Sequence, residues 1–206
     1  MEKDVNIKRH HSQTSYTRFL FFLIATKMDK FAAKLVRDFV EFDPNFFEQG
    51  TTEERQYPIF LAFRAEMYDT VRAIMEHPKV DVNAIKCTYT DDPFPFYVFT
   101  TTYKKSMYKT AKTREAIDFA IEVLKQIKDI NQTDSCGCTM LHYACEDSMM
   151  YPIMEYICSR EDAELEIQDY DGATPLDIAL YAQNRQAAKF LKEKIEQKFA
   201  GVKKNA

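Results

Sequence analysis

Glycine is scarce in this chain, which has only four among its 206 residues. That is about 2% of the residues, against a usual share of about 7%. The four glycines lie far apart in the sequence, at Gly50, Gly137, Gly172 and Gly201. Phosphate-binding loops of NTPases and of dinucleotide-binding folds need clustered glycines, because the backbone must approach the phosphates closely. The sequence therefore excludes both classes and favours a mostly helical protein with few tight turns.

Excess positive charge and long apolar runs are also lacking. The formal net charge is −4, which predicts no nucleic-acid partner. The apolar run at residues 19–25 is much shorter than the roughly 20 residues that cross a bilayer. A polar stretch precedes this run as in a signal peptide, but no small-residue cleavage site follows it. We interpret the run as a buried helix and expect no membrane association.

Cysteine occurs five times, an odd number in a chain large enough to fold without disulfides. This count favours reduced thiols inside a cell. We therefore expect a cytoplasmic protein.

A repeat becomes visible when the chain is compared with itself. Residues 134–144 and 169–179 share Asp, Gly, Thr, Leu and Ala in the same phase, and Gly172 follows Gly137 by 35 residues. Residues 57–62 match the pattern of residues 174–179, and residues 94–99 form a weaker copy. Such a period is typical of proteins built from stacked repeats.

Each copy is followed by a segment with apolar residues three and four positions apart, which indicates one apolar helix face. These segments are residues 70–76, 114–128, 151–158 and 187–195. The first two end in short extended segments that carry Asn83 and Asn131. The sequence therefore predicts pairs of helices joined by short extended connections.

In these segments the sequence resembles the ankyrin-repeat family, whose repeat unit reads roughly D-x-x-G-x-T-P-L-H-x-A, followed by a second helix and then D-V-N. The matching residues are Gly137, Thr139, Leu141, His142 and Ala144; Gly172, Thr174, Pro175, Leu176 and Ala179; and Asp81, Val82 and Asn83. The resemblance implies an all-α solenoid of stacked helix-turn-helix units with short hairpin-like loops.

The resemblance also implies a division of the chain. We expect an N-terminal tail at residues 1–15, a repeat array at 16–200 and a C-terminal tail at 201–206. Within the array we expect a capping repeat at residues 16–50 with helices at 19–25 and 31–40, units at 51–87, 88–133 and 134–168, and a C-terminal capping unit at 169–200.

The second full unit departs from the repeat pattern. It has Phe99 where alanine is usual and is longer than its neighbours, with the extra residues at 102–113 between its two helices. We interpret this insertion as a solvated loop. Because it is basic with interleaved tyrosines, the alternative is a contact with phosphate groups or an acidic partner through Tyr103 and Tyr108.

One cluster suggests a second class of function. Cys136, Cys138, His142 and Cys145 are soft ligands within ten residues, and their alternative interpretation is a metal- or redox-responsive site. In the repeat frame these side chains point in different directions, so we expect no metal site. We also expect no catalytic residues and no cofactor, because neighbouring carboxylates such as Asp91 and Asp92 fall at hairpin tips.

Ankyrin arrays bind proteins on a concave face built from hairpin tips and first helices, and the resemblance implies such a face here. Its residues would be Glu53, Glu54, Gln56 and Arg64; Thr90, Asp91, Thr101 and Thr102; Ser135, Cys138, Glu146 and Asp147; and Tyr170, Asp171 and Tyr181. Carboxylates dominate this set and tyrosines supply apolar anchors, so a partner with a basic groove or a Lys/Arg-rich segment would be complementary.

The expected function is therefore that of a monomeric, non-catalytic protein-binding module. Such a module would act as a regulator, or as an effector that a pathogen delivers into a host cell.

Overall fold

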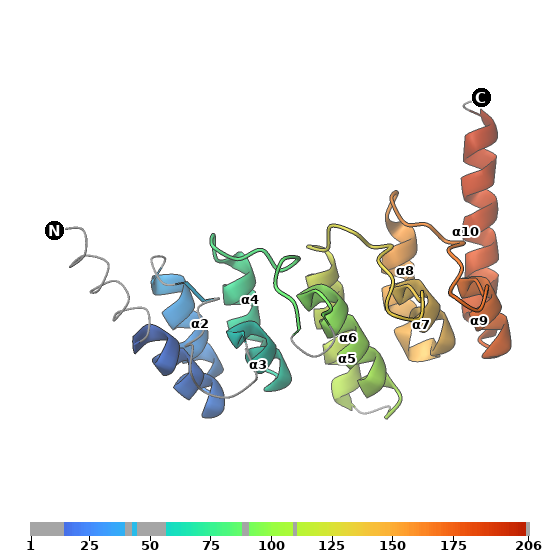
Figure 1. Ribbon diagram of the computed structural model, residues 1–206. Coiled ribbons are helices and arrows are strands. Elements are labelled where there is room, and N and C mark those ends of the chain that lie inside the picture. Colours follow the sequence, from blue (N-terminus) through green and yellow to red (C-terminus); the bar gives the residue numbers. More distant parts are fainter. Residues whose placement is uncertain (1–14, 40–42, 45–56, 88–90, 109–110, 205–206) are drawn as a thin grey trace. The chain divides into compact units, whose positions relative to one another are not determined.

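The computed structural model describes residues 15–39, 43–44, 57–87, 91–108 and 111–204. The chain divides into two compact units, residues 1–94 and 95–206, which are treated separately below. The secondary structure in the described residues consists of helices and two isolated β-bridges, so the expected all-α class is confirmed. Figure 1 shows the helices of each unit following one another in pairs.

Unit 1 contains two helix pairs. Their helices are residues 15–25, α2 (Asp29–Asp38), α3 (Pro58–Arg64) and α4 (Tyr68–Glu76). Helix α2 packs on α4, and the Asp29 carboxylate accepts hydrogen bonds from the Thr70 amide at 2.8 Å and the Thr70 hydroxyl at 2.6 Å. This carboxylate satisfies N–H groups at the start of α4 that have no partner within the helix. Asp29 therefore links the two pairs.

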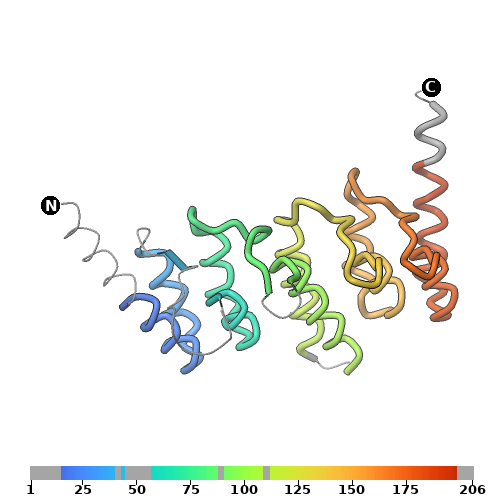
Figure 2. Tube along the Cα trace, viewed as in Figure 1, coloured from blue at the N-terminus to red at the C-terminus, as the bar shows by residue number. Residues whose placement is uncertain are grey.

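Unit 2 contains three helix pairs, of which the first begins at the last residue of unit 1. Its helices are α5 (Phe94–Ser106), α6 (Ala111–Leu124), α7 (Met140–Glu146), the short 3₁₀ helix η1 (Ser148–Met150), α8 (Tyr151–Ser159), α9 (Pro175–Tyr181) and α10 (Arg185–Lys204). The first helices of successive pairs pack together, since α7 contacts α9, and so do the second helices, since α8 contacts α6 and α10. The connections from α6 to α7 and from α8 to α9 run along the same side of unit 2 (Figure 2).

A helix overlaps each segment where one was expected, with different bounds, but one interpretation was wrong. The insertion at residues 102–113 is mostly helical, because α5 continues to Ser106 and α6 begins at Ala111. The solvated loop is limited to the connection, where Met107 and Tyr108 are exposed and residues 109–110 lie outside the described part of the chain. The added residues lengthen the first helix to 13 residues, against seven in α3, α7 and α9.

The ends of the array also differ from expectation. Helix α10 continues to Lys204, through residues that we expected in a tail, because one glycine weakens a long helix by only about 1 kcal/mol and does not end it. Residue 15 already begins the first helix, while residues 1–14 and the junction at Gly50 lie outside the described residues.

Candidate partner-binding face

The two clearest repeat copies fold into the same hairpin. The Asp134 side chain accepts hydrogen bonds from the amides of Cys136 at 2.8 Å and Cys138 at 3.0 Å. In the next repeat, the Asp169 side chain accepts hydrogen bonds from the amides of Asp171 at 3.0 Å and Ala173 at 2.9 Å. The glycines that complete both turns have positive φ angles, 78° at Gly137 and 82° at Gly172. The offset of 35 residues therefore reflects one repeated hydrogen-bonded turn.

The two hairpins also contact each other. The Tyr170 amide donates to the Cys136 carbonyl at 3.0 Å. A Cβ atom added at Gly137 would lie 2.7 Å from the ring and 2.9 Å from the amide nitrogen of Tyr170, so only glycine fits beneath this residue. Tyr170 itself remains 78% exposed. The packing of the hairpins thus holds an aromatic side chain out at the hairpin tip.

His142 contributes to this contact between hairpins through both ring nitrogens. Its Nδ1 accepts from the Thr139 amide at 3.0 Å, which places the ring proton on Nε2. Nε2 then donates to the Ala173 carbonyl of the next hairpin at 3.1 Å. Asp177 occupies the equivalent position one unit later, where its carboxylate accepts from the Thr174 amide and hydroxyl and caps α9. Those hydrogen bonds lower the pKa of Asp177.

The end of the long helix α5 fixes the two carboxylates at the C-terminal end of α7. The Tyr103 hydroxyl donates to the Glu146 carboxylate, and the Ser106 hydroxyl donates to the Asp147 carboxylate at 2.6 Å. The Tyr143 hydroxyl donates to Asp134, and its ring lies 5.2 Å from that of Tyr103. We refer to these six residues as the tyrosine–carboxylate row.

The row raises the pKa of its two tyrosines. The cause is first burial of the phenols and second the hydrogen bond that each makes to a carboxylate. A phenol is protonated at neutral pH in any case, and the raised pKa lets both hydroxyls continue to donate their hydrogen bonds at more alkaline pH. The negative charge at this surface is thus held in place by its neighbours.

Nine face residues were predicted in unit 2, and the structure places eight of them at or near the surface. Five of these eight are exposed, namely Ser135, Glu146, Tyr170, Asp171 and Tyr181. The other three, Thr101, Cys138 and Asp147, are half-buried. Among the aromatic residues that the structure describes, Tyr181 is the most accessible, at 91%. The prediction was wrong for Thr102, whose side chain is fully buried.

Thr102 was misplaced because the insertion was interpreted as a loop. On the extended helix α5, Thr102 falls on the same inward side as Phe99 and Ser106, three and four positions away. Its hydroxyl has no hydrogen-bond partner among the described residues.

Two of the predicted face residues lie in the described part of unit 1. Arg64 is exposed at the end of α3. Asp91 is exposed and accepts a hydrogen bond from Lys86 at 2.7 Å. The remaining four, Glu53, Glu54, Gln56 and Thr90, lie outside the described residues.

Sequence reasoning missed the members of the row that do not belong to the repeat motif. Tyr103 was considered only as a ligand-stacking residue, yet it is 8% exposed and donates to a residue 43 positions later. The available signal was weak, since Tyr103 and Ser106 merely continue the helical spacing of Phe99.

The cysteine cluster does not converge on one point. Cys136 is exposed at the hairpin tip, whereas Cys145 is buried and its thiol lies 3.8 Å from the Met154 sulfur. Burial and the charges of Asp134 and Asp169 raise the pKa of Cys138 to about 11, which keeps it a protonated thiol and a weak nucleophile. In the part of the chain that the structure describes, no three His, Cys, Asp or Glu side chains are arranged to hold a metal ion.

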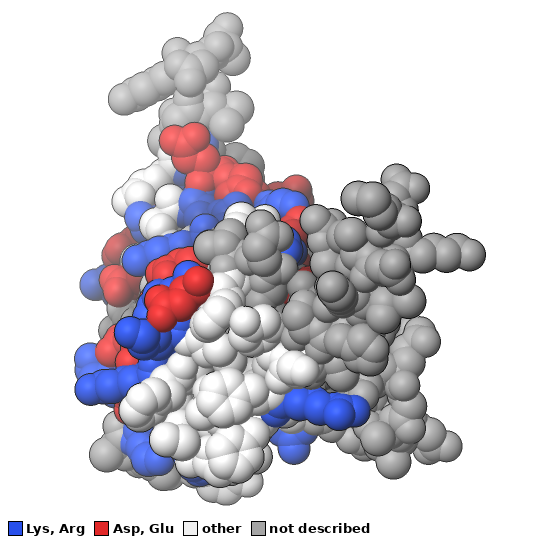
Figure 3. Space-filling model, turned by 90° about the vertical axis from the view of Figure 1, so that its left-hand side faces the viewer, with Lys and Arg blue, Asp and Glu red and all other residues white. Residues whose placement is uncertain are grey.

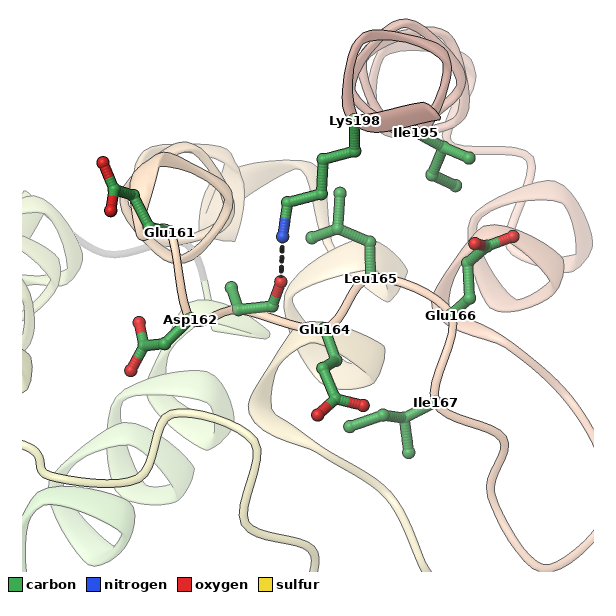
Figure 4. Close-up of a pocket in the computed structure, with 9 residues that line it drawn as sticks. Glu161, Asp162, Glu164, Leu165, Glu166, Ile167, Ile195 and Lys198 are labelled. Atoms are coloured by element: carbon green, nitrogen blue, oxygen red, sulfur yellow. Dashed lines mark hydrogen bonds between the residues drawn. The ribbon is translucent and has the colours of Figure 1, made fainter. Parts of the chain in front are cut away.

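A shallow pocket of about 400 Å³ lies beside the loop that follows α8. The Lys198 ammonium group donates to the Ala163 carbonyl at its edge. Figure 4 shows that the carboxylates of Glu161, Asp162, Glu164 and Glu166 point in different directions around the loop. These carboxylates therefore do not converge on one point at which a cation could bind.

These features define a helical-repeat protein in which, within unit 2, successive hairpins contact each other and the first helices α7 and α9 pack together. Residues 109–202 match the family model for ankyrin repeats, in three copies, and this part of the chain belongs to the ankyrin-repeat family. The resemblance found in the sequence is confirmed. No helix among the described residues is both long and apolar enough to cross a membrane.

One curated protein is similar to part of this chain. Over 73 residues the chain is 37% identical to the ADP-ribosylation factor GTPase-activating protein AGD4 of Arabidopsis thaliana. The matched segment is 34% of this chain and only 9% of that protein.

Proposed function

We propose that this chain is a non-catalytic protein-binding module, and that unit 2 binds its partner through the hairpin tips and first helices. The observation that carries the proposal is the exposure of two tyrosines, Tyr170 at 78% and Tyr181 at 91%. Exposed aromatic side chains are enriched among the residues that dominate protein interfaces. Both belong to the last repeat copy, one in its hairpin and one at the end of α9.

The chemistry of the partner follows from the charge on the same elements. Asp171 is exposed beside Tyr170, and Glu146 and Asp147 are held at the end of α7 by the tyrosine–carboxylate row. Carboxylates on the same unit as exposed aromatic anchors favour a partner segment rich in lysine or arginine. A basic segment can pair with the carboxylates while its aliphatic stems cover the tyrosine rings.

A binding test should reverse charge where the structure permits it without damage to the fold. Asp147 is unsuitable, because it also caps η1 through the Met149 amide at 3.0 Å. Asp171→Lys changes an exposed side chain, and Tyr181→Ala removes an exposed ring. A photo-crosslinking residue at position 181 captures the partner, and calorimetry with the purified partner then measures each variant.

We expect each variant to weaken binding by about tenfold, the effect of losing about 1.4 kcal/mol. Lys192→Glu serves as the matched control, because Lys192 is exposed on α10 rather than on a hairpin or first helix. The proposal fails if both variants bind like the unmodified protein, or if the control weakens binding equally.

A further inference from the structure

The first helix pair of unit 1 carries an apolar face that is open to solvent. The exposed fractions are 49% for Phe19, 56% for Phe22 and 63% for Phe31, with Met28 at 39% and Phe39 at 40%. Figure 3 views this side of the molecule, where uncharged side chains with aromatic rings form a continuous area that has charged groups along one edge. We call these five residues the aromatic face.

Helical geometry explains why these residues are not part of the core. Helix α2 packs on α4 and buries Ala32, Leu35 and Val36. Phe31 lies outside this buried stripe. In the helix of residues 15–25, Leu20 and Leu23 point inward, while Phe19 and Phe22 lie one turn apart on another side with their ring centroids 6.4 Å apart. The aromatic face is therefore a second apolar surface of the same helix pair.

The outer helix of unit 2 has the opposite character. The exposed residues of α10 include Lys189, Lys192, Glu193 and Glu196. Three exposed phenylalanines on one helix pair instead form an apolar patch of the kind that marks an interaction surface. The aromatic face is therefore a candidate for contact with another surface.

We propose that a second copy of this chain covers the aromatic face in a two-fold symmetric dimer. An aromatic side chain contributes roughly 200 Å², so the exposed fractions correspond to about 500 Å² of apolar surface in each copy. A standard stable interface buries about 800 Å² per partner around a more apolar core. The aromatic face supplies that core, and the neighbouring polar side chains supply the rim.

The charges along α2 also suit a two-fold arrangement. Lys27 and Lys30 lie at or just before its N-terminal end, and Asp38 is its last residue. The other two charges at these ends face α4, since Asp29 binds Thr70 and Arg37 pairs with Glu76. In a symmetric dimer with the two α2 helices antiparallel, the lysines of one copy lie near the aspartate of the other. Lys34 and Asp38 of one chain are 3.8 Å apart, and their side chains are 74% and 53% exposed. Such an exposed pair is weak enough to exchange partners across the two-fold axis.

Sedimentation velocity of the full chain over a wide concentration range tests the dimer. We expect reversible dimerisation, and we expect Phe22→Glu and Phe31→Glu each to raise the dissociation constant by at least about tenfold. Tyr181→Glu, which places the same charge on an exposed aromatic position of unit 2, should leave it unchanged. Helical circular dichroism should be the same in all three variants, since each changes an exposed side chain.

A charge-exchange cycle tests the antiparallel arrangement. Lys30→Glu and Asp38→Lys should each weaken the dimer, and the double variant should recover most of the loss. Three results would overturn the proposal. They are a monomer at every concentration, a dimer insensitive to Phe22→Glu, and dimerisation that appears only after residues 2–14 are deleted, which would mean that the chain covers its own aromatic face. Monomeric protein that binds phosphatidylserine vesicles through Phe22 would instead assign the face to a membrane surface.

Discussion

At the scale of single residues, two glycines occupy equivalent turns but have different neighbours. Gly137 and Gly172 share a positive φ, which costs an L-residue roughly 1–2 kcal/mol. Only Gly137 lies beneath another residue, since an added Cβ would come within 3 Å of Tyr170, whereas nothing lies within 4 Å at Gly172. A substitution at Gly172 therefore introduces backbone strain alone, whereas the same substitution at Gly137 adds steric overlap with Tyr170.

Alanine at these two positions gives a prediction at the residue scale. Gly172→Ala should lower the free energy of unfolding by about 1 kcal/mol, from backbone strain alone. Gly137→Ala should lower it by a further 1–3 kcal/mol or so, because Tyr170 and its hairpin must move. Urea unfolding followed by circular dichroism measures both. Equal losses would contradict the steric role of Gly137.

Much of this local detail could be predicted from the sequence. The equivalence of the two hairpins followed from a shared Asp, Gly and Thr, because a turn of this kind depends on a few neighbouring residues. The position of His142 beside Thr139 could be predicted for the same reason. Burial of Thr102 could not, because it depends on how far α5 extends and on what packs against it.

At the scale of elements, the additional turns of α5 hold carboxylates of the next repeat in fixed positions. Tyr103 and Ser106 belong to these turns, and they bind the carboxylates of Glu146 and Asp147. No repeat motif specifies these residues, since their partners lie more than 40 positions away. The insertion thus acts through two helix-to-carboxylate contacts rather than as a loop.

The raised pKa values of Tyr103 and Tyr143 predict how stability depends on pH. Above about pH 10 tyrosines of the unfolded chain lose their protons, while these two keep theirs in the folded protein. The unfolded state then binds fewer protons, so the free energy of unfolding falls as pH rises beyond 10. Below pH 10 both states are protonated and the contribution of the tyrosines is fully present.

Phenylalanine variants test this pH dependence. Tyr103→Phe and Tyr143→Phe should each make the loss of stability between about pH 9 and 11 shallower, because one linked proton is removed. Urea unfolding at a series of pH values measures the slope. Tyr181→Phe is the matched control for loss of one hydroxyl group. Unchanged slopes in both variants would mean that burial and the hydrogen bonds to Glu146 and Asp134 do not raise the pKa of these tyrosines in the folded protein.

At the scale of the molecule, the successive repeats within unit 2 are linked by hydrogen bonds between the connections that follow their second helices. The Asn131 amide group donates to the Asp162 carbonyl at 2.7 Å and accepts from the Glu164 amide at 2.8 Å. Arg160 adds a hydrogen bond to the Ile127 carbonyl at 2.9 Å. Contacts of this kind between neighbours make a repeat array unfold as a whole.

Removal of the Asn131 link should therefore reduce cooperativity. In Asn131→Ala we expect helices α8 to α10 to exchange their amide hydrogens faster than α5 and α6, whereas the unmodified protein should show similar rates in both. Hydrogen exchange with mass spectrometry measures this by segment. Asn83→Ala, at the matching motif position in unit 1, should leave exchange in unit 2 unchanged. Uniform acceleration throughout unit 2 would indicate that Asn131 contributes stability without separating its parts.

The sequence by itself determined the repeat, its turns and the order of its helices. Each of these depends on short-range chemistry, such as glycine at positive φ, threonine at a helix start or apolar residues at helical spacing. Only the tertiary structure decided which residues are covered. Apolar spacing identifies a helix face but does not show whether a neighbour lies against it, so exposed Phe22 and Phe31 resemble core residues in the sequence. Tyr103 likewise resembles a surface residue, because its partner Glu146 is distant along the chain.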